Sequence, residues 1–205
     1  MARPGSDADK RLIEAGIALI AENGTKALTV RKACAKAGVN LGLFSYFFTN
    51  KDIYLKIIFD NIYADAEKFV DMNQVQQFNE LEQLKYFYER MTVYAFLRRN
   101  LIRAIFVECL IDEKMHDDYV QKNILKPVRL PLQLIEKAQC AGYLRQDLTV
   151  TEIYRRLFFE LIMPVLFSNS VSLLMLNKNI PEYNQSDSQK CLVDLFNELE
   201  VKKCQ

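Results

Sequence analysis

Apolar residues recur at three- and four-residue spacing along most of the chain, which is the pattern of amphipathic helices. The first run predicts a helix over residues 7–23, with Ser6 or Asp7 as its N-cap and Gly24 as its end. Because no segment alternates strictly like a strand, we expect an all-α fold with about nine helices in total. The later helices are expected over about residues 78–98, 101–114, 117–141, 149–177 and 187–202.

Two short helices are predicted between the first helix and a longer fourth one. Thr29 is a suitable N-cap for the segment TVRKACAKAG, in which Gly38 supplies a left-handed C-cap. Asn40 then begins the segment LGLFSYFF. Two short helices joined by a Gly-containing turn form a helix-turn-helix, whose second helix enters a major groove. We therefore expect a three-helix DNA-binding domain at residues 1–50 and a helical ligand-binding and dimerisation domain at residues 51–205.

The segment TVRKACAKAGVNLGLFSYFFTNK, residues 29–51, resembles the signature of the TetR (tetracycline-repressor) family of transcriptional regulators. The family pattern has a capping Thr, Ala-Gly-Val at the turn, Ser or Asn before the recognition helix, Gly two residues on, then an apolar-aromatic cluster and Lys. The matching residues are Thr29, Ala37, Gly38, Val39, Asn40, Gly42, Phe44, Phe48 and Lys51. The resemblance is close over the first 60 or so residues and covers the rest only by length and element order.

The resemblance implies a homodimeric regulator, a repressor that binds an inverted-repeat operator in double-stranded DNA. It also implies a small apolar or amphipathic effector that releases the DNA, without identifying that effector. Ser45 departs from the family, which usually has Tyr or His there, while Tyr46 matches an aromatic residue often found beside it. The residues expected to bind DNA are Thr29, Arg31, Asn40, Ser45, Tyr46 and Lys51, whereas Val30, Val39, Phe44 and Phe48 are expected to form the small domain's core.

The distribution of charge agrees with a DNA-binding N-terminus. The whole chain is nearly balanced, with 27 basic and 26 acidic residues. Residues 1–60 carry nine basic and six acidic side chains, whereas the remainder carries 18 basic and 20 acidic ones. The basic excess therefore coincides with the predicted helix-turn-helix.

The C-terminal region is expected to hold the effector and the dimer interface. An effector site needs an apolar cavity with a few polar groups, and its expected residues are Tyr88, Met91, Arg103, Phe106, Glu108 and Glu160. The apolar run at residues 157–176 and the last helix predict a two-fold dimer that pairs into a four-helix bundle. Its expected interface residues are Leu192, Leu195, Phe196 and Leu199.

No enzymatic motif, metal site or cofactor is expected. His116 is the only histidine, and the five cysteines are widely spaced without a Cys-x-x-Cys pair, as in a reduced cytoplasmic protein. The N-terminus lacks the apolar run of a secretory signal. No Gly-rich phosphate loop or nucleophile elbow is present in the sequence.

Two other classes of protein stay open. Residues 157–176 are apolar and long enough to span a bilayer, but Glu160 and Pro164 within them favour burial in a helical bundle, so no membrane partner is expected. The second alternative is a helical dimeric binding or structural protein without specific DNA binding. Specific retardation of DNA would separate the regulator from both.

Overall fold

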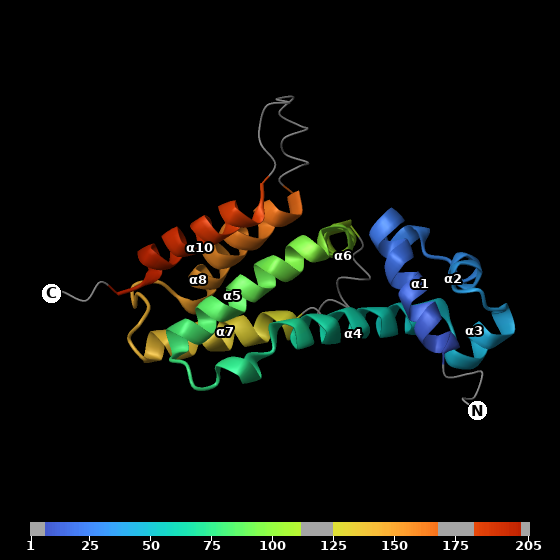
Figure 1. Cartoon of the computed structure of the whole chain (residues 1–205), viewed down its shortest axis with the longest axis horizontal. Coiled ribbons are helices and arrows are strands. Elements are labelled where there is room, and N and C mark those ends of the chain that lie inside the picture. Colours follow the sequence, from blue (N-terminus) through green and yellow to red (C-terminus); the bar gives the residue numbers. More distant parts are fainter. Residues whose placement is uncertain (1–6, 112–124, 168–182, 202–205) are drawn as a thin grey trace, which may run out of the picture. The chain divides into compact units, whose positions relative to one another are not determined.

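The computed structural model describes residues 7–111, 125–167 and 183–201 (Figure 1), and for residues 108–111 and 125–127 it describes the backbone alone. Within these ranges the regular structure is helical, and the only extended pairing is one antiparallel bridge between Leu144 and Glu200. The all-α prediction is therefore confirmed. The α-helices are α1 (Ala8–Asn23), α2 (Val30–Ala37), α3 (Leu41–Phe47), α4 (Lys51–Val70), α5 (Glu80–Leu97), α6 (Arg99–Ile111), α7 (Leu125–Cys140), α8 (Val150–Leu157) and α10 (Gln185–Leu199).

Three shorter turns complete the described helical structure. The 3₁₀ turns are η1 (Thr25–Ala27) and η2 (Met72–Val75), and a π-helical turn, η4 (Phe158–Ile162), follows α8 directly. Residues 163–167 then continue as α-helix. The predicted helix over residues 149–177 is thus interrupted by a widened turn, and its part beyond residue 167 lies outside the described residues.

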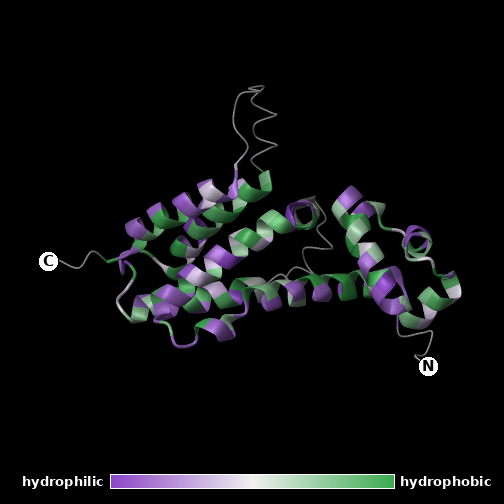
Figure 2. Ribbon diagram, viewed as in Figure 1, coloured by the Kyte–Doolittle hydropathy of each residue, from purple (hydrophilic) through white to green (hydrophobic). Residues whose placement is uncertain are grey.

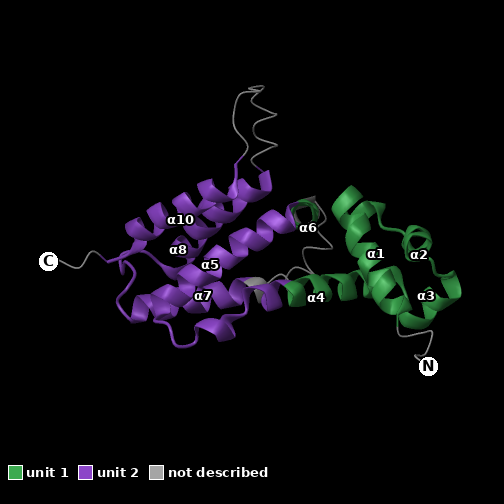
Figure 3. Ribbon diagram, in the orientation of Figure 1, with its two compact units in different colours: residues 1–65, 100–123 green, residues 66–99, 124–205 purple. Residues whose placement is uncertain are grey.

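The chain forms two compact units (Figure 3). Unit 1 contains residues 1–65 and 100–123, and unit 2 contains residues 66–99 and 124–205. Helix α4 is continuous across the division, because it runs from Lys51 to Val70. The predicted division into domains of residues 1–50 and 51–205 is placed at the end of the helix-turn-helix, and it stays a prediction.

Local hydrogen bonds explain where the first helices begin and end. The Thr29 side chain accepts a hydrogen bond from the Lys32 amide at 3.2 Å, and the Asn40 side chain accepts one from the Leu43 amide at 2.8 Å. Gly38 between them has a left-handed φ of 65°, which a residue without a Cβ adopts at little cost. These predicted caps are confirmed. Asp7 occupies the N-cap position of α1, as one of the two predicted residues, but its side chain makes no capping hydrogen bond.

Tyr54 of α4 lies at the centre of the core of unit 1. Its side chain is fully buried, and its hydroxyl donates a hydrogen bond to the Leu12 carbonyl of α1. Burial raises the pKa of Tyr54, so the phenol stays protonated as this donor. A Cβ placed on Gly16 of α1 would lie 2.3 Å from Ile58 Cδ1 and 2.6 Å from the Tyr54 hydroxyl oxygen. Glycine at this position therefore lets α4 pack directly on the backbone of α1.

Unit 2 is a helical bundle in which α5 packs against α7 and α10, and α7 packs against α8. Hydrophobic and hydrophilic residues alternate along these helices (Figure 2), as expected when one side of each faces a core. Buried residues of that core include Leu84, Phe87, Leu134, Ile135, Ile153, Leu157, Leu195, Phe196 and Leu199. Asn184 begins α10 with a complete capping box, so this helix starts before the predicted residue 187.

The π-helical turn η4 has a cause in the sequence. In an α-helix the Glu160 carbonyl would accept from the amide of residue 164, but Pro164 has no N–H and its ring would clash with that carbonyl. The helix widens, and the Met163 amide donates to the Phe158 carbonyl instead. The Cys191 thiol of α10 donates to the Glu160 carbonyl, at 3.4 Å, to which residue 164 supplies no amide.

Candidate DNA-binding site

Helix α3 presents one exposed face, formed by Leu41, Gly42, Ser45 and Tyr46. At about 100° per residue these four positions fall within an arc of about 140°. Leu41 is 51% exposed and Tyr46 is 80% exposed, and they stand at the two edges of the arc. The small residues Gly42 and Ser45 lie between them, so the face consists of a low central strip with a large side chain on each side. We call these four residues the α3 face.

The opposite side of α3 fixes the helix to unit 1. Phe44 is 3% exposed and Phe48, just past the end of α3, is 2% exposed. The Phe44 ring meets Tyr54 edge-on at 5.1 Å between centroids, and the Phe48 ring lies 4.8 Å from the same tyrosine. Because Tyr54 is in turn bonded to α1, the orientation of the α3 face is set by the core rather than by a flexible loop. The expectation that Phe44 and Phe48 are core residues is confirmed.

The six residues expected to bind DNA are all exposed. The Thr29 and Asn40 side chains are engaged as helix caps, and the Ser45 hydroxyl donates to the Leu41 carbonyl of its own helix at 3.1 Å. Tyr46 has its ring edge-on to Phe47 at 5.1 Å and its hydroxyl in solvent. The Tyr46 hydroxyl is therefore a polar group near α3 that forms no hydrogen bond within the described structure.

Basic side chains surround the helix-turn-helix. Residues 24–56 carry six basic side chains and a single carboxylate, Asp52. Neither Arg31, at the start of α2, nor Lys51, the first residue of α4, forms an ion pair within the described residues. Lys36 is engaged, because its ammonium lies 2.8 Å from the Glu22 carboxylate. Arg31 and Lys51 are therefore among the cations available to phosphate groups.

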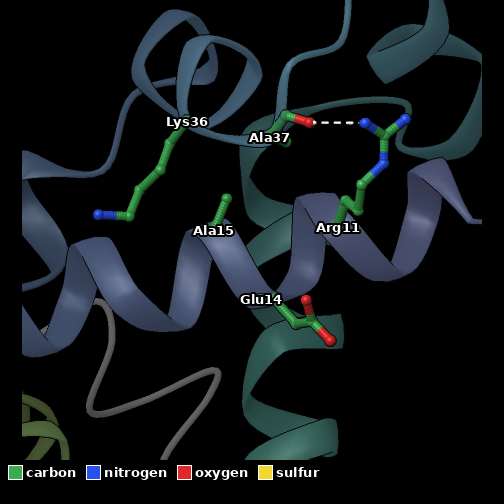
Figure 4. A pocket seen from close by; sticks show the side chains of 5 residues that line it. All are labelled: Arg11, Glu14, Ala15, Lys36 and Ala37. Carbon is green, nitrogen blue, oxygen red and sulfur yellow. Dashed lines mark hydrogen bonds between the residues drawn. The ribbon is translucent and has the colours of Figure 1, made fainter.

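An open pocket of about 260 Å³ lies between α1 and α2 (Figure 4). Its lining residues are Arg11, Glu14, Ala15, Lys36 and Ala37. Figure 4 shows the Arg11 guanidinium reaching the Ala37 carbonyl, which accepts its hydrogen bond at 3.2 Å. Since both cations of this pocket already have partners, its polar walls serve to join α1 to α2.

The residues expected to bind an effector belong to both compact units. Tyr88, Met91 and Glu160 are in unit 2, whereas Arg103 and Phe106 are in unit 1. Glu160 is exposed and forms an ion pair with Arg156 at 3.1 Å, and Arg156 also contacts the Glu198 carboxylate of α10 at 2.6 Å. The side chain of Glu108 lies outside the described residues. These assignments stay predictions.

Tyr88 of α5 differs from the other expected effector residues. It is 2% exposed, and its hydroxyl has no hydrogen-bond partner among the described residues. Burial, and then the nearby Tyr154 phenol, raise the pKa of Tyr88 well above its usual value, so the hydroxyl keeps its proton. A buried donor without an acceptor is uncommon in folded proteins and calls for an explanation.

Three of the four expected dimer residues are buried within their own subunit. Leu195, Phe196 and Leu199 are each 2% exposed or less, and Leu192 is half-buried. Their helical spacing is therefore sufficiently explained by the core of unit 2. The large apolar side chains that α10 and η4 leave exposed are Val193, at 55%, and Phe159, at 56%.

The sequence analysis did not single out Leu41, Phe159 or Val193. A signal existed for Leu41, because α3 has apolar residues at positions 41, 43, 44 and 47, more than one side of a seven-residue helix can bury. For Val193 and Phe159 no such local signal exists, since their exposure depends on how α10 and η4 pack.

Within residues 7–111, 125–167 and 183–201, no helix combines the length and apolar content needed to cross a membrane. The apolar run at residues 157–176 is described only as far as residue 167. In the same described ranges, no three His, Cys, Asp or Glu side chains are grouped so that they could hold a metal ion.

The fold and the α3 face define a helix-turn-helix protein with a second, helical unit. Residues 12–53 match the family described as bacterial regulatory proteins, tetR family. The N-terminal domain is therefore a tetR-family domain, as its signature predicts, and the chain has the fold of this family's transcriptional regulators. No curated protein matches the chain in sequence.

Solved structures of regulators share this fold over nearly the whole chain. A protein from Rhodococcus sp. assigned to the TetR-family transcriptional regulators has a TM-score of 0.73 and 16% identity, with 95% of this chain and 99% of that chain covered. The fatty acid degradation regulator FadR from Bacillus halodurans has a TM-score of 0.72 and 17% identity, with 96% of each chain covered. FadR from Bacillus subtilis, solved in complex with stearoyl-CoA, has a TM-score of 0.67 and 17% identity, with 93% and 98% covered. These similar proteins are transcription regulators rather than enzymes.

Proposed function

We propose that this chain is a homodimeric transcriptional repressor that binds an inverted-repeat operator through one α3 face per subunit. The observation that carries the proposal is the α3 face itself, exposed on one side and fixed to the buried Tyr54 on the other. A short helix held in this way is the element that helix-turn-helix proteins insert into a major groove. Two-fold symmetry of the protein then requires two half-sites in the operator.

Selection of bound fragments from the source organism's DNA by the full chain tests this function. We expect enrichment of a short inverted repeat, and protection of both half-sites in a footprint. Random DNA of equal length is the control, because basic residues give every such protein some affinity for any sequence. Selection of no sequence, or protection of an asymmetric site, would contradict the proposal and favour a helical dimer without specific DNA binding.

The effector proposed is a small apolar or amphipathic molecule that binds in unit 2 and weakens DNA binding. Support comes from the aromatic residues of α5 and α8, from the unpartnered Tyr88 hydroxyl, and from the fold shared with a regulator solved in complex with stearoyl-CoA. Tyr88 would donate its hydrogen bond to a polar atom of this molecule. An effector that favours the DNA-free state by about 1–3 kcal/mol lowers operator affinity by about 5- to 150-fold.

Titration of the protein–operator complex with fatty acids and acyl-CoA thioesters of increasing chain length tests this proposal. We expect release by at least one apolar member of the series and no release by free coenzyme A. A compound that binds tightly but leaves operator affinity unchanged would show that binding is not coupled to release.

The proposed function also includes a cytoplasmic location, because a DNA-binding regulator needs access to DNA.

A further inference from the structure

We infer that α3 reads thymine in its operator, through contact between Leu41 and the thymine 5-methyl group, rather than by hydrogen bonds to guanine. This inference rests on the proposed function and concerns which base the α3 face recognises. Sequence-specific proteins commonly read guanine with Arg or Lys and adenine with Asn or Gln. The α3 face has none of these side chains.

The polar side-chain groups of the α3 face are two hydroxyls, those of Ser45 and Tyr46, and neither forms the paired contact by which Arg or Lys reads guanine. The Ser45 hydroxyl is bonded to the Leu41 carbonyl at 3.1 Å. Asn40, just before the face, caps α3 with its side-chain oxygen, which accepts from the Leu43 amide at 2.8 Å, so the paired contact of Asn with adenine, which needs this oxygen, would cost the cap. What the face offers to a base edge is therefore mainly apolar surface, of which Leu41 carries the largest aliphatic part, being 51% exposed. Among base edges in a major groove, thymine alone presents a methyl group.

Gly42 supplies a second, independent reason to expect close contact. Glycine within a helix costs about 0.5–1 kcal/mol relative to alanine, and none of the described residues of unit 1 requires it here. A Cβ on Gly42 would find its nearest neighbour, Asn40 Oδ1, at 3.4 Å, which is ordinary contact, and its φ is not positive. The space that glycine leaves is on the outside of the molecule. A bare backbone at the middle of the α3 face lets a base edge approach closely enough for Leu41 to touch it.

Charge identifies the occupant of this face as DNA rather than another protein. An exposed leucine and tyrosine alone would suit many partners. Residues 24–56, however, carry six basic side chains against one carboxylate, and Arg31 and Lys51 have no ion-pair partner within the described residues. An exposed apolar face in a segment with this excess of basic residues suits a groove that offers methyl groups on its floor and phosphates along its walls.

The inference is tested on the operator obtained by fragment selection. Each thymine is replaced in turn by uracil, which keeps every hydrogen-bonding group and lacks only the methyl group. For the wild-type chain we expect uracil at one position in each half-site to weaken binding about 3- to 5-fold per methyl group lost. The Leu41→Ala variant should bind the thymine operator more weakly, by a similar factor, and should no longer distinguish thymine from uracil at that position.

Two further variants separate readout from folding. Leu97→Ala removes an exposed leucine from unit 2, where Leu97 is 67% exposed, and should leave both affinities unchanged. Gly42→Ala should raise the thermal stability of the protein and yet weaken operator binding at least 10-fold, because the added methyl group holds the helix away from the bases. Stable Gly42→Ala protein with unreduced operator affinity would contradict close approach.

Failure of the inference can be told apart from failure of the proposed function. If the wild-type chain selects an inverted repeat and binds uracil and thymine versions equally at all positions, methyl readout is wrong although operator binding stands. If Leu41→Ala still discriminates against uracil, another residue contacts the methyl group and the assignment to Leu41 is wrong. If no sequence is selected at all, both the function and the inference are wrong.

Discussion

At the scale of single residues, exposure and burial assign different roles to side chains that look alike in the sequence. Lys36 and Lys51 both flank the short helices, but only Lys36 is paired within the protein. Phe44 and Tyr46 are two residues apart, and one lies in the core while the other is 80% exposed. A role in DNA binding can therefore be tested residue by residue without disturbing the fold.

Lys51 is expected to contact a phosphate group and not a base. The Lys51→Ala variant should weaken binding to operator and to random DNA by the same factor, because the contact carries no sequence information. The slope of log affinity against log salt concentration should fall by about one unit per lost contact. Equilibrium binding at several salt concentrations measures both. Lys68→Ala, which removes an exposed lysine from the other end of α4, is the control. An unchanged slope for Lys51→Ala would place this residue outside the interface.

Tyr88 is expected to be retained for a reason other than stability. Replacing it by Phe removes a buried hydroxyl without a partner and leaves the packing of the ring intact. The free energy of unfolding should rise by up to about 1–3 kcal/mol, the usual penalty of such a group, and effector response should weaken. Urea unfolding and effector titration measure the two effects. Tyr86→Phe, at a hydroxyl 3.5 Å from Gln74, should change neither. A loss of stability in Tyr88→Phe would reveal a partner for its hydroxyl.

At the scale of helices, the packing of α4 on α1 depends on one missing side chain. The Gly16→Ala variant should lower the free energy of unfolding of the protein by about 1–3 kcal/mol, since the new methyl group would force Tyr54 and Ile58, both fully buried, to shift within the core. Thermal unfolding followed by circular dichroism provides the measurement. Gly42→Ala is the matched variant, because it adds the same methyl group to a helix without an internal clash. If Gly16→Ala is the more stable of the two, the close packing of α1 and α4 is not as described.

The start and end of α2, and the start of α3, could be predicted from sequence because they depend on local hydrogen bonds. Thr29, Gly38 and Asn40 each act on amides or carbonyls within a few residues of themselves. Features set by distant residues could not be predicted in this way. The burial of Leu195, Phe196 and Leu199 follows from packing of α10 against α5, and helical periodicity alone does not distinguish a subunit core from a dimer interface.

The DNA-binding site also has features that could be predicted from the sequence and features that depend on packing between distant residues. Its location on the second short helix could be predicted, since the TetR-type signature specifies that helix and its supporting aromatic residues. Which side chains it exposes could not be read from the pattern, because Leu41 and Phe44 differ only in how α3 lies on Tyr54. The sequence pattern favours polar residues as DNA contacts, and this stays a prediction for Asn40 and Ser45, whose side chains also form hydrogen bonds within the helix-turn-helix.

At the scale of the whole molecule, the proposed dimer is expected to use side chains that the subunit core leaves free. The Val193→Asp and Phe159→Asp variants should dissociate the dimer while keeping the helical content, because each residue is more than half exposed in the subunit. The Phe196→Asp variant should instead unfold unit 2, since a carboxylate would replace a ring that is 1% exposed. Sedimentation velocity combined with circular dichroism distinguishes dissociation from unfolding. Dimers that persist in both Val193→Asp and Phe159→Asp would show that another surface joins the subunits.

The widened turn after α8 ties together two positions that are far apart in the sequence. Pro164 deprives the Glu160 carbonyl of its amide partner, and the Cys191 thiol takes that amide's place. Any other residue at position 164 would have an amide that can donate to the Glu160 carbonyl, and residue 191 would then not be needed as a donor. We therefore expect substitutions at positions 164 and 191 to occur together in related sequences. Lineages that lose the proline should soon lose the cysteine, whereas lineages that keep the proline should keep a cysteine, serine or threonine opposite it.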